Sequence, residues 1–259
     1  MIVLASDYVG FKVLEFLFQR GEQVAFVVKD PADRGGYNER IEQLCLSSNQ
    51  RGVLVDAGQL NNNDELLERV AHTRPRVGIL AWWPHILKGP MRSIPQLGWL
   101  NLHPSYLPFN RGKHPNFWCL ADGTPCGVSL HFIDEGVDTG DIVAQARLNI
   151  SWEDTGETVY RKCRELILKL FTEKFDDIVA NRLPRIKQAS EIGSFHTASE
   201  IEKASRIDLE ANYKASKLLN IIRARTFPPH PTAYFYDGDK KYSVQIIIKE
   251  TKDPTNEGV

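Results

Sequence analysis

An asparagine and a histidine stand two residues apart in the stretch NLHPSYLPFNRGK, at residues 101–113, where an apolar run ends. Side chains two residues apart on a strand point to the same side, so Asn101 and His103 would face one crevice while Leu102 packs into the core. A histidine can transfer protons near neutral pH, and an asparagine amide can donate a hydrogen bond to an oxygen on which negative charge develops. The pair therefore predicts a polar catalytic site at the end of a strand.

The sequence also offers a carboxylate that could orient the His103 imidazole. Asp138 lies in the loop DEGVDTG, where a glycine on each side lets the backbone bend toward a neighbouring strand end. Each motif alone has an ordinary structural explanation, because many histidines are structural and an asparagine before a turn often caps its own backbone. The combination favours Asn101, His103 and Asp138 as one constellation.

Other kinds of chemistry have less support in the sequence. No GxGxxG motif follows the first apolar run, and neither a Walker loop nor a GxSxG nucleophile motif occurs. The histidines lack metal-ligand spacing, so no metal is expected, and His131 is expected to play a structural role on a strand face. The four cysteines form no CxxC pair and are interpreted as reduced thiols in the core, at positions Cys45, Cys119, Cys126 and Cys163.

Short apolar runs alternate with amphipathic helical stretches through the first part of the chain. This alternation predicts an α/β fold, with a mainly parallel twisted sheet and helices on both faces. Ligands of such sheets bind beyond the carboxyl ends of the strands, which is where Asn101 and His103 are expected. Strands are expected at residues 2–6, 24–28, 52–56, 76–83, 98–103, 127–133 and 141–150, and helices at 10–21, 61–75, 116–123 and 154–181.

The remainder of the chain predicts a small second region. Residues 183–206 are polar and irregular in pattern, a helix is expected at 208–224, and a β-hairpin around Asp237–Gly238 is expected at 232–248. We therefore expect two units, a catalytic one at 1–182 and a small C-terminal one at 183–259. An isolated hairpin is only marginally stable, so this hairpin is expected to pack against a second copy in a homodimer.

The overall composition narrows the choice of partners. The chain has 259 residues and a formal net charge of −1, which argues against nucleic-acid binding. No signal peptide and no apolar run long enough for a membrane span are seen, so a cytoplasmic protein without a membrane partner is expected. Arg111 and Lys113, in the loop after His103, are candidate contacts for a phosphate group.

The stretches NLHPSYLPFNRGKHP and GVSLHFIDEGVDTGDIVAQ resemble the formyltransferases that use N10-formyltetrahydrofolate, and the order of elements fits over roughly residues 1–180. The resemblance implies a parallel-sheet domain that holds both the folate and the catalytic residues, without a metal. Asn101, His103 and Asp138 fall on the family's catalytic set. A primary amine would attack the formyl carbon, and these three residues would manage the protons and the developing negative charge.

The resemblance also assigns the two binding sites. The folate pocket would be formed by Trp83, Ile86, Leu87, Glu135, Val137 and Asp138. For an acceptor that carries phosphate, the cations in the loop after His103 and in the C-terminal tail are the expected contacts, which are Arg111, Lys113, Arg206, Arg223 and Arg225.

The choice of acceptor rests on the tail LLNIIRARTFPPHPTAYFYDGDKKYSVQIII, which resembles that of nucleotide-sugar N-formyltransferases. A 3-amino or 4-amino sugar on a nucleoside diphosphate is therefore favoured, in the biosynthesis of a bacterial surface glycan such as O-antigen. Enzymes like methionyl-tRNA formyltransferase or glycinamide ribonucleotide formyltransferase are the alternatives within the family. A non-catalytic module that binds folate or nucleotide sugar is an alternative of a different class, against which the complete catalytic set argues.

Overall fold

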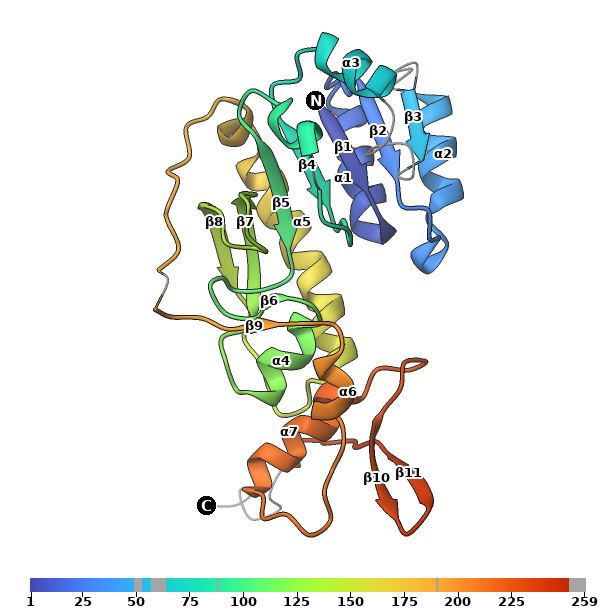
Figure 1. The fold of residues 1–259 in the computed structure, drawn as a ribbon, viewed down its shortest axis with the longest axis vertical. Helices are drawn as coiled ribbons and strands as arrows, with labels where there is room; N and C mark the ends of the chain where they lie inside the picture. The colour runs from blue at the N-terminus through green and yellow to red at the C-terminus, as the bar shows by residue number, and fades with distance from the viewer. Residues whose placement is uncertain (49–52, 57–63, 88, 190, 252–259) are drawn as a thin grey trace, which may run out of the picture.

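A twisted seven-stranded sheet forms the upper part of the molecule in the computed structural model, which describes residues 1–48, 53–56, 64–87, 89–189 and 191–251 (Figure 1). The strand order is β3-β2-β1-β4-β5-β7-β8. The first five are parallel, β7 is antiparallel to β5, and β8 is antiparallel to β7. The predicted α/β fold with a mainly parallel sheet is confirmed. The strands are β1 Ile2–Ala5, β2 Phe26–Lys29, β3 Val53–Asp56, β4 Gly78–Ala81, β5 Trp99–His103, β7 Gly127–Phe132 and β8 Ile142–Arg147.

Helices cover both faces of the sheet, as the alternating apolar pattern predicts. One face is covered by α1 (Asp7–Gln19), α2 (Asn38–Ser47), α4 (Pro115–Ala121) and α5 (Gly156–Val179). The other is covered by α3 (Asp64–His72) and a short 3-10 segment at Gly89–Ser93. Residues 61–63 of the expected helix at 61–75 lie outside the described residues. Among the described residues, none of the helices combines the length and apolar character that crossing a membrane requires.

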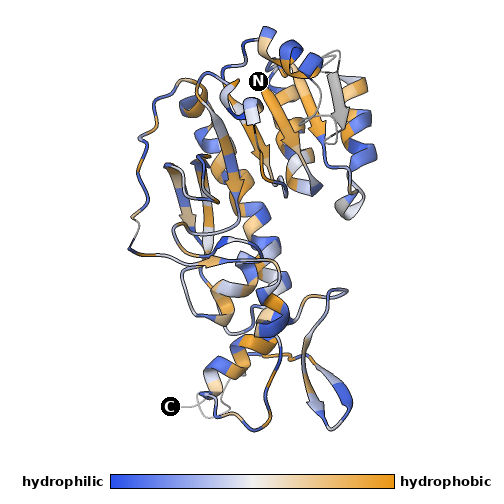
Figure 2. Cartoon of the chain, in the orientation of Figure 1, coloured by the Kyte–Doolittle hydropathy of each residue, from blue (hydrophilic) through white to orange (hydrophobic). Residues whose placement is uncertain are grey.

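The buried strands divide their side chains between these two layers. In β1, Val3 and Ala5 pack toward α1 and α5, while Ile2 and Leu4 pack toward α3. Both layers are apolar, so β1 and β2 are hydrophobic along most of their length rather than alternating with polar residues (Figure 2). Continuous burial of this kind fixes the positions of the strand ends, where the polar residues lie.

The long helix α5 links the sheet to the lower part of the molecule (Figure 1). It begins with a reciprocal cap, in which the Thr155 side chain accepts from the Thr158 backbone N–H and the Thr158 hydroxyl accepts from the Thr155 N–H. Near this end, a Cβ on Gly156 would lie 2.1 Å from the carbonyl oxygen of Ala224, so only glycine allows α7 (Ala215–Arg225) to approach α5 so closely.

The lower part contains the short strands β6 (Arg111–Gly112) and β9 (Phe195–His196), which are distant in sequence and pair in parallel (Figure 1). Helix α6 follows, and a hairpin of β10 and β11 packs with α7 around a small apolar core of Ile207, Ile222 and Ala233. Residues 183–206 are therefore not irregular throughout, because β9 and α6 lie within them. The helix expected at 208–224 begins later, at Ala215. The bounds are α6 Glu200–Ala204, α7 Ala215–Arg225, β10 Ala233–Asp237 and β11 Lys240–Val244.

The cysteines differ from the sequence prediction in one respect. Cys119 at the end of α4 and Cys126 just before β7 form a disulfide, because the turn between them brings the two thiols together. The prediction of four reduced thiols is therefore wrong for this pair. Cys45 and Cys163 are free and buried, and burial raises the pKa of these thiols to about 11 and about 12.

Candidate active site

Asn101 and His103 lie at the carboxyl end of β5, and the neighbouring antiparallel strand β7 adds a second histidine. The strand register places Asn101 opposite His131 and His103 opposite Ser129. The Nδ2 atom of Asn101 lies 3.1 Å from Nε2 of His131 and donates to Oδ1 of Asp138 at 3.3 Å. His131 lies on a strand, as expected from the sequence, and it also belongs to the polar cluster, where it holds the amide of Asn101.

Asp138 reaches this cluster because its loop turns sharply. Its φ angle is +56°, in the left-handed region that few residues other than glycine, asparagine and aspartate adopt. Its Oδ2 accepts from the backbone N–H of Gly112 at 2.8 Å and lies 3.6 Å from Nε2 of His103. Its own carbonyl oxygen accepts from Gln188 at 2.8 Å. The carboxylate is therefore held from β6 and from the segment that precedes β9.

The environment keeps Asp138 ionised. Burial alone would raise the pKa of this carboxyl, but the neighbouring His103 and His131 and the Gly112 N–H outweigh it. The pKa of Asp138 therefore lies well below its usual range. The site contains a fixed negative charge at any pH near neutrality.

His103 has a buried ring with one nitrogen engaged and the other free. The ring donates a hydrogen bond to the backbone carbonyl of Asn110, and no described residue makes a hydrogen bond with Nε2. Burial lowers the pKa of His103, and the opposing effect of Asp138 does not overcome it. His103 is therefore neutral near pH 7, with an unprotonated Nε2 beside the cavity described below.

His131 is fixed by its neighbours on both ring nitrogens. Its Nδ1 lies 3.0 Å from the carbonyl oxygen of Phe132, so Nδ1 carries the proton and Nε2 accepts from Asn101. The pairing of β7 with β8 also shifts between Leu130 and His131, an irregularity of the kind that re-aims side chains beside active sites. His103, His131 and Asp138 are close enough together to hold a metal ion. However, hydrogen bonds from Asn101 and Gly112 already occupy two of the three ligand groups, so the geometry favours acid–base chemistry.

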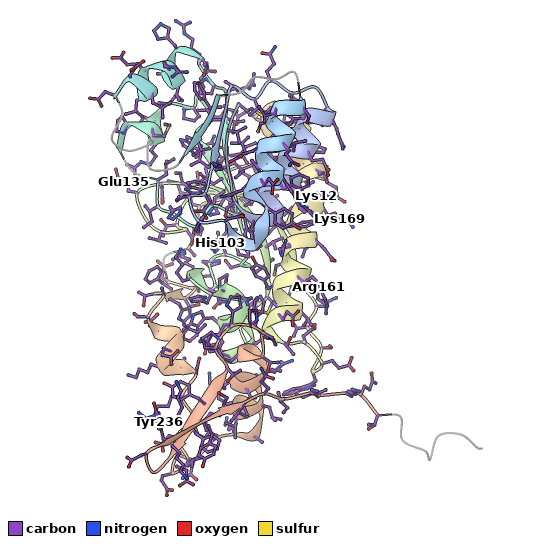
Figure 3. All side chains as sticks on the ribbon, turned by 90° about the vertical axis from the view of Figure 1, so that its right-hand side faces the viewer. Lys12, His103, Glu135, Arg161, Lys169 and Tyr236 are labelled. Atoms are coloured by element: carbon purple, nitrogen blue, oxygen red, sulfur yellow. A yellow bond between two sulfur atoms is a disulfide. The ribbon has the colours of Figure 1, made fainter. Side chains whose placement is uncertain are left out.

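A cavity of about 1020 Å³ opens from this cluster, and all six residues expected in the folate pocket line it. Its walls include Ile86 and Val137, which are 64% and 38% exposed, so apolar surface is available to a ligand. Residues 195–198, at and after β9, also line the cavity, a contribution that the sequence pattern does not indicate. His103 lies at mid-height of the molecule, and Tyr236 lies on the hairpin at the lower end (Figure 3).

The two cations of the loop after His103 have different surroundings. Arg111 donates from Nε and Nη2 to the side-chain oxygen of Gln188, at 3.0 and 2.8 Å. Lys113 lines the cavity and donates to the carbonyl oxygen of Pro84 at 2.7 Å. Lys113 therefore lies where a ligand can reach it, while Arg111 fixes the segment that carries Gln188.

The three arginines of the C-terminal region are not among the described residues that line the cavity. Arg206 lies over the ring of Tyr236 on the hairpin, and Arg225 is paired with Glu202 at 3.6 Å. Arg223 is buried, and its Nη1 donates to the carbonyl oxygens of Ser151, Trp152 and Asp154. The structure thus gives Arg223 a structural task, holding the loop before α5, in place of the acceptor contact expected from the sequence.

At one end of the sheet an asparagine, a histidine and an ionised aspartate line a cavity with exposed apolar side chains, an arrangement suited to acid–base group transfer. Residues 13–174 match the family model described as formyl transferase. Residues 200–250 match the N-formyltransferase dimerization C-terminal domain. The chain therefore belongs to the formyl transferase family, as the resemblance seen in the sequence implies.

Similar proteins include enzymes with different acceptors. The methionyl-tRNA formyltransferase of Carboxydothermus hydrogenoformans is 31% identical over 227 residues, which cover 86% of this chain and 71% of that protein. A 4-N formyltransferase from Francisella tularensis has the same fold, with a TM-score of 0.79, 22% identity, and coverage of 96% of this chain and 98% of that one. The formyltransferase PseJ from Anoxybacillus kamchatkensis, solved with UDP-4,6-dideoxy-4-formamido-L-AltNAc and tetrahydrofolate, has a TM-score of 0.54 and 26% identity, covering 78% of this chain and 88% of that one.

Proposed function

We propose that this chain transfers the formyl group of N10-formyltetrahydrofolate to the primary amine of a sugar linked to a nucleotide. The observation that carries the proposal is that Asn101, His103 and Asp138 lie together in the lining of a cavity to which residues 195–198 of the C-terminal region also contribute. The match of residues 200–250 to the C-terminal domain of N-formyltransferases supports an amino-sugar acceptor. The PseJ complex supports it too, since that enzyme was solved with a folate and a formamido sugar nucleotide.

The residues that line the cavity fit a folate. The exposed side chains of Ile86 and Val137, together with Trp83 and Leu87, offer apolar surface for a flat ring, and Glu135 and Asp138 flank Val137 in the adjoining loop. When bound, the folate supplies the formyl carbon that the amine attacks. We assign no metal to this site, because Asn101 and Gly112 already donate hydrogen bonds to His131 and Asp138, two of the three groups that could hold one.

The protein's part in the reaction follows from the protonation states. Neutral His103 accepts the proton of the attacking amine at its free Nε2. The resulting imidazolium lies 3.6 Å from the ionised Asp138, which stabilises it until the proton passes to the departing nitrogen. The amide of Asn101 donates to His131 and, by a longer hydrogen bond of 3.3 Å, to Asp138. In the reaction it exchanges the longer bond for one to the carbonyl oxygen, as negative charge develops there.

The cellular setting and the assembly belong to the same proposal. We assign catalysis and folate binding to residues 1–182, and acceptor binding and dimerisation to residues 183–259. A homodimer that forms through the C-terminal hairpin accords with the match of residues 200–250 to a dimerization domain. An amino sugar on a nucleotide is a precursor of bacterial surface glycans, so we place the enzyme in the cytoplasm and in a pathway such as O-antigen biosynthesis.

Methionyl-tRNA is the second candidate acceptor, because a methionyl-tRNA formyltransferase is 31% identical over most of this chain. The net charge of −1 weighs against it, since an RNA ligand of that size is usually held by a strongly basic surface. The amino-sugar acceptor is therefore preferred.

A parallel assay tests the proposal. The full chain is supplied with N10-formyltetrahydrofolate and, separately, with dTDP- and UDP-linked 3-amino and 4-amino sugars, with initiator methionyl-tRNA and with glycinamide ribonucleotide. Formylation of an amino-sugar nucleotide, with kcat/KM at least 100-fold above the other acceptors, is expected. Preferential formylation of the tRNA or of the ribonucleotide would refute the acceptor assignment. Folate binding without formylation of any acceptor would support the non-catalytic module.

A further inference from the structure

Two residues that line the cavity outside the catalytic constellation, Lys113 and His114, have Arg225 and His230 as neighbours behind the cavity wall. Lys113 and His114 line the cavity where β6 leads into α4. Helix α4 packs against α7, which brings Arg225, at the end of α7, next to His114. His230, in the segment after α7, also acts on the His114 ring. We refer to Lys113, His114, Arg225 and His230 as the cationic cluster.

The cluster has more positive charge than its neighbours balance. The Arg225 side chain is only 11% exposed. Among the described residues, Glu202 is its acidic partner, at 3.6 Å, and its Nε makes no hydrogen bond with any of them. Lys113 donates to a neutral carbonyl oxygen rather than to a carboxylate. A half-buried guanidinium with an unused N–H is costly unless an acceptor completes its hydrogen bonds.

The environment of His114 shows the same imbalance. Its pKa is lowered by burial, and then by Arg225, Lys113 and His230, all of which act in the same direction. Lys113, just after β6, and Arg225, on α7, are thus both cations that act on this ring. An anion placed among them would be attracted by all of them at once, and it would favour the protonated form of His114.

We propose, on the basis of the proposed function, that the cationic cluster binds the diphosphate of the nucleotide-linked sugar. The bidentate guanidinium of Arg225 and the ammonium of Lys113 suit phosphate oxygens, because charge-assisted hydrogen bonds are the strong ones. His114 and His103 line the same cavity, so an acceptor held by its diphosphate at the cluster extends its sugar toward Nε2 of His103. The cluster therefore orients the amine for attack.

The backbone of His114 suggests a suitable variant. Its φ and ψ angles are 57° and 43°, in the left-handed region, where asparagine is tolerated and alanine is strained. His114→Asn therefore removes the imidazole and retains the backbone conformation. Arg225→Gln retains the stem and a polar head but removes the charge. Lys169→Ala is the matched control, because Lys169 is 70% exposed on α5 (Figure 3).

The first measurement is calorimetric titration of the full-length variants with dTDP, with UDP and, separately, with tetrahydrofolate. We expect His114→Asn and Arg225→Gln each to raise the Kd of the nucleoside diphosphate by roughly 10-fold or more, since each removes a charge-assisted contact. The Kd of tetrahydrofolate should change less than 2-fold, and Lys169→Ala should match the wild type. Weaker folate binding with unchanged nucleotide binding would assign the cluster to the folate carboxylates and overturn the proposal.

The second measurement is the pKa of His114, followed by NMR with and without the nucleoside diphosphate. Binding should raise this pKa relative to the free chain, and an unchanged pKa at saturation would overturn the proposal. Neither measurement needs turnover. If nucleotides bind through the cluster while no amino sugar is formylated, the proposed function fails and the cluster assignment stands. If neither nucleotide binds the wild type, the cluster assignment is overturned.

Discussion

Replacement of Asp138 by asparagine separates the charge of this residue from its geometry. Asparagine tolerates the left-handed φ of +56° and can still accept the Gly112 N–H through its side-chain oxygen. The loop should therefore keep its course, and the main loss is the negative charge beside His103. Asp138→Asn is thus a sharper test of the mechanism than Asp138→Ala.

The size of the effect follows from the distance. Nε2 of His103 and Oδ2 of Asp138 are 3.6 Å apart, and both side chains are largely buried. Two unit charges at this separation attract by about 4.6 kcal/mol at an effective dielectric constant of about 20. Because the proton is only partly transferred in the transition state, we expect kcat to fall by about 10²–10³-fold, within the range for acid–base residues.

The pH dependence gives a second signature. Burial lowers the pKa of His103, while the Asp138 charge opposes that shift. Without this charge the pKa of His103 falls further, so the acidic limb of kcat/KM should move to lower pH in Asp138→Asn. The free energy of unfolding also depends on pH, because the pKa of Asp138 is lower in the folded chain than in the unfolded chain. The stability that the ionised carboxylate contributes is present above its unfolded pKa and is lost as pH falls through the folded value.

The assay is steady-state formylation of an amino-sugar nucleotide between pH 5 and 8, with thermal melting to confirm the fold. Asp177→Asn serves as the control, because that carboxylate lies on α5 and pairs with Arg182 at 2.7 Å. Near-normal kcat in a well-folded Asp138→Asn variant would refute the stabilisation of the imidazolium. Movement of the acidic limb to higher pH would refute the assigned role of the charge in setting the pKa of His103.

Four further predictions concern other parts of the chain. Trp83→Ala should raise the KM for the folate about 10-fold and change kcat less than 3-fold, because it removes an apolar side chain from the wall of the cavity. An unchanged KM would show that the folate binds elsewhere. Arg223→Ala should lower the free energy of unfolding, measured with urea, by about 2–4 kcal/mol, because it leaves three carbonyl oxygens without their hydrogen-bond donor. A raised KM for the acceptor at unchanged stability would show instead that Arg223 binds the acceptor. Reduction of the Cys119–Cys126 disulfide should lower the free energy of unfolding, measured by calorimetry, by about 2.5 kcal/mol. If a thiol titration of the unreduced, denatured chain finds four free thiols, the disulfide is excluded. A chain that ends before Thr226 should be monomeric or insoluble; sedimentation of the full-length chain as a monomer at micromolar concentration would contradict the dimer.

Much of the fold follows directly from the order of apolar runs. The strands expected at 98–103 and 127–133 correspond to Trp99–His103 and Gly127–Phe132, and the helix expected at 154–181 corresponds to Gly156–Val179. Asn101 and His103 are predictable as a pair, because their spacing of two matches the period of a strand. Asp138 is predictable as a candidate, because its loop is bracketed by glycines.

The remaining features depend on contacts between distant segments. His131 joins the site only because the register of β5 and β7 sets it opposite Asn101, and a strand register cannot be read from one sequence. The disulfide depends on how the turn after α4 closes, which the spacing of Cys119 and Cys126 does not reveal. Arg223 resembles a surface cation in its helical pattern, and only the approach of α7 to the loop before α5 buries it.

The pairing of β6 with β9 determines where the C-terminal region of this chain could be replaced by that of another family member. The N–H of Gly112 holds the Asp138 carboxylate, while a Cβ at Gly112 would lie 2.3 Å from the carbonyl oxygen of His196. The neighbouring N–H groups of Arg111 and Lys113 donate to the carbonyls of Ser194 and His196. A chimera whose foreign sequence began at residue 183 would thus lose the β9 residues that pair with β6 and support the Asp138 carboxylate. A chimera whose foreign sequence began after Thr197 would keep them. Engineers who graft a foreign specificity region onto this chain should therefore retain its residues through Thr197.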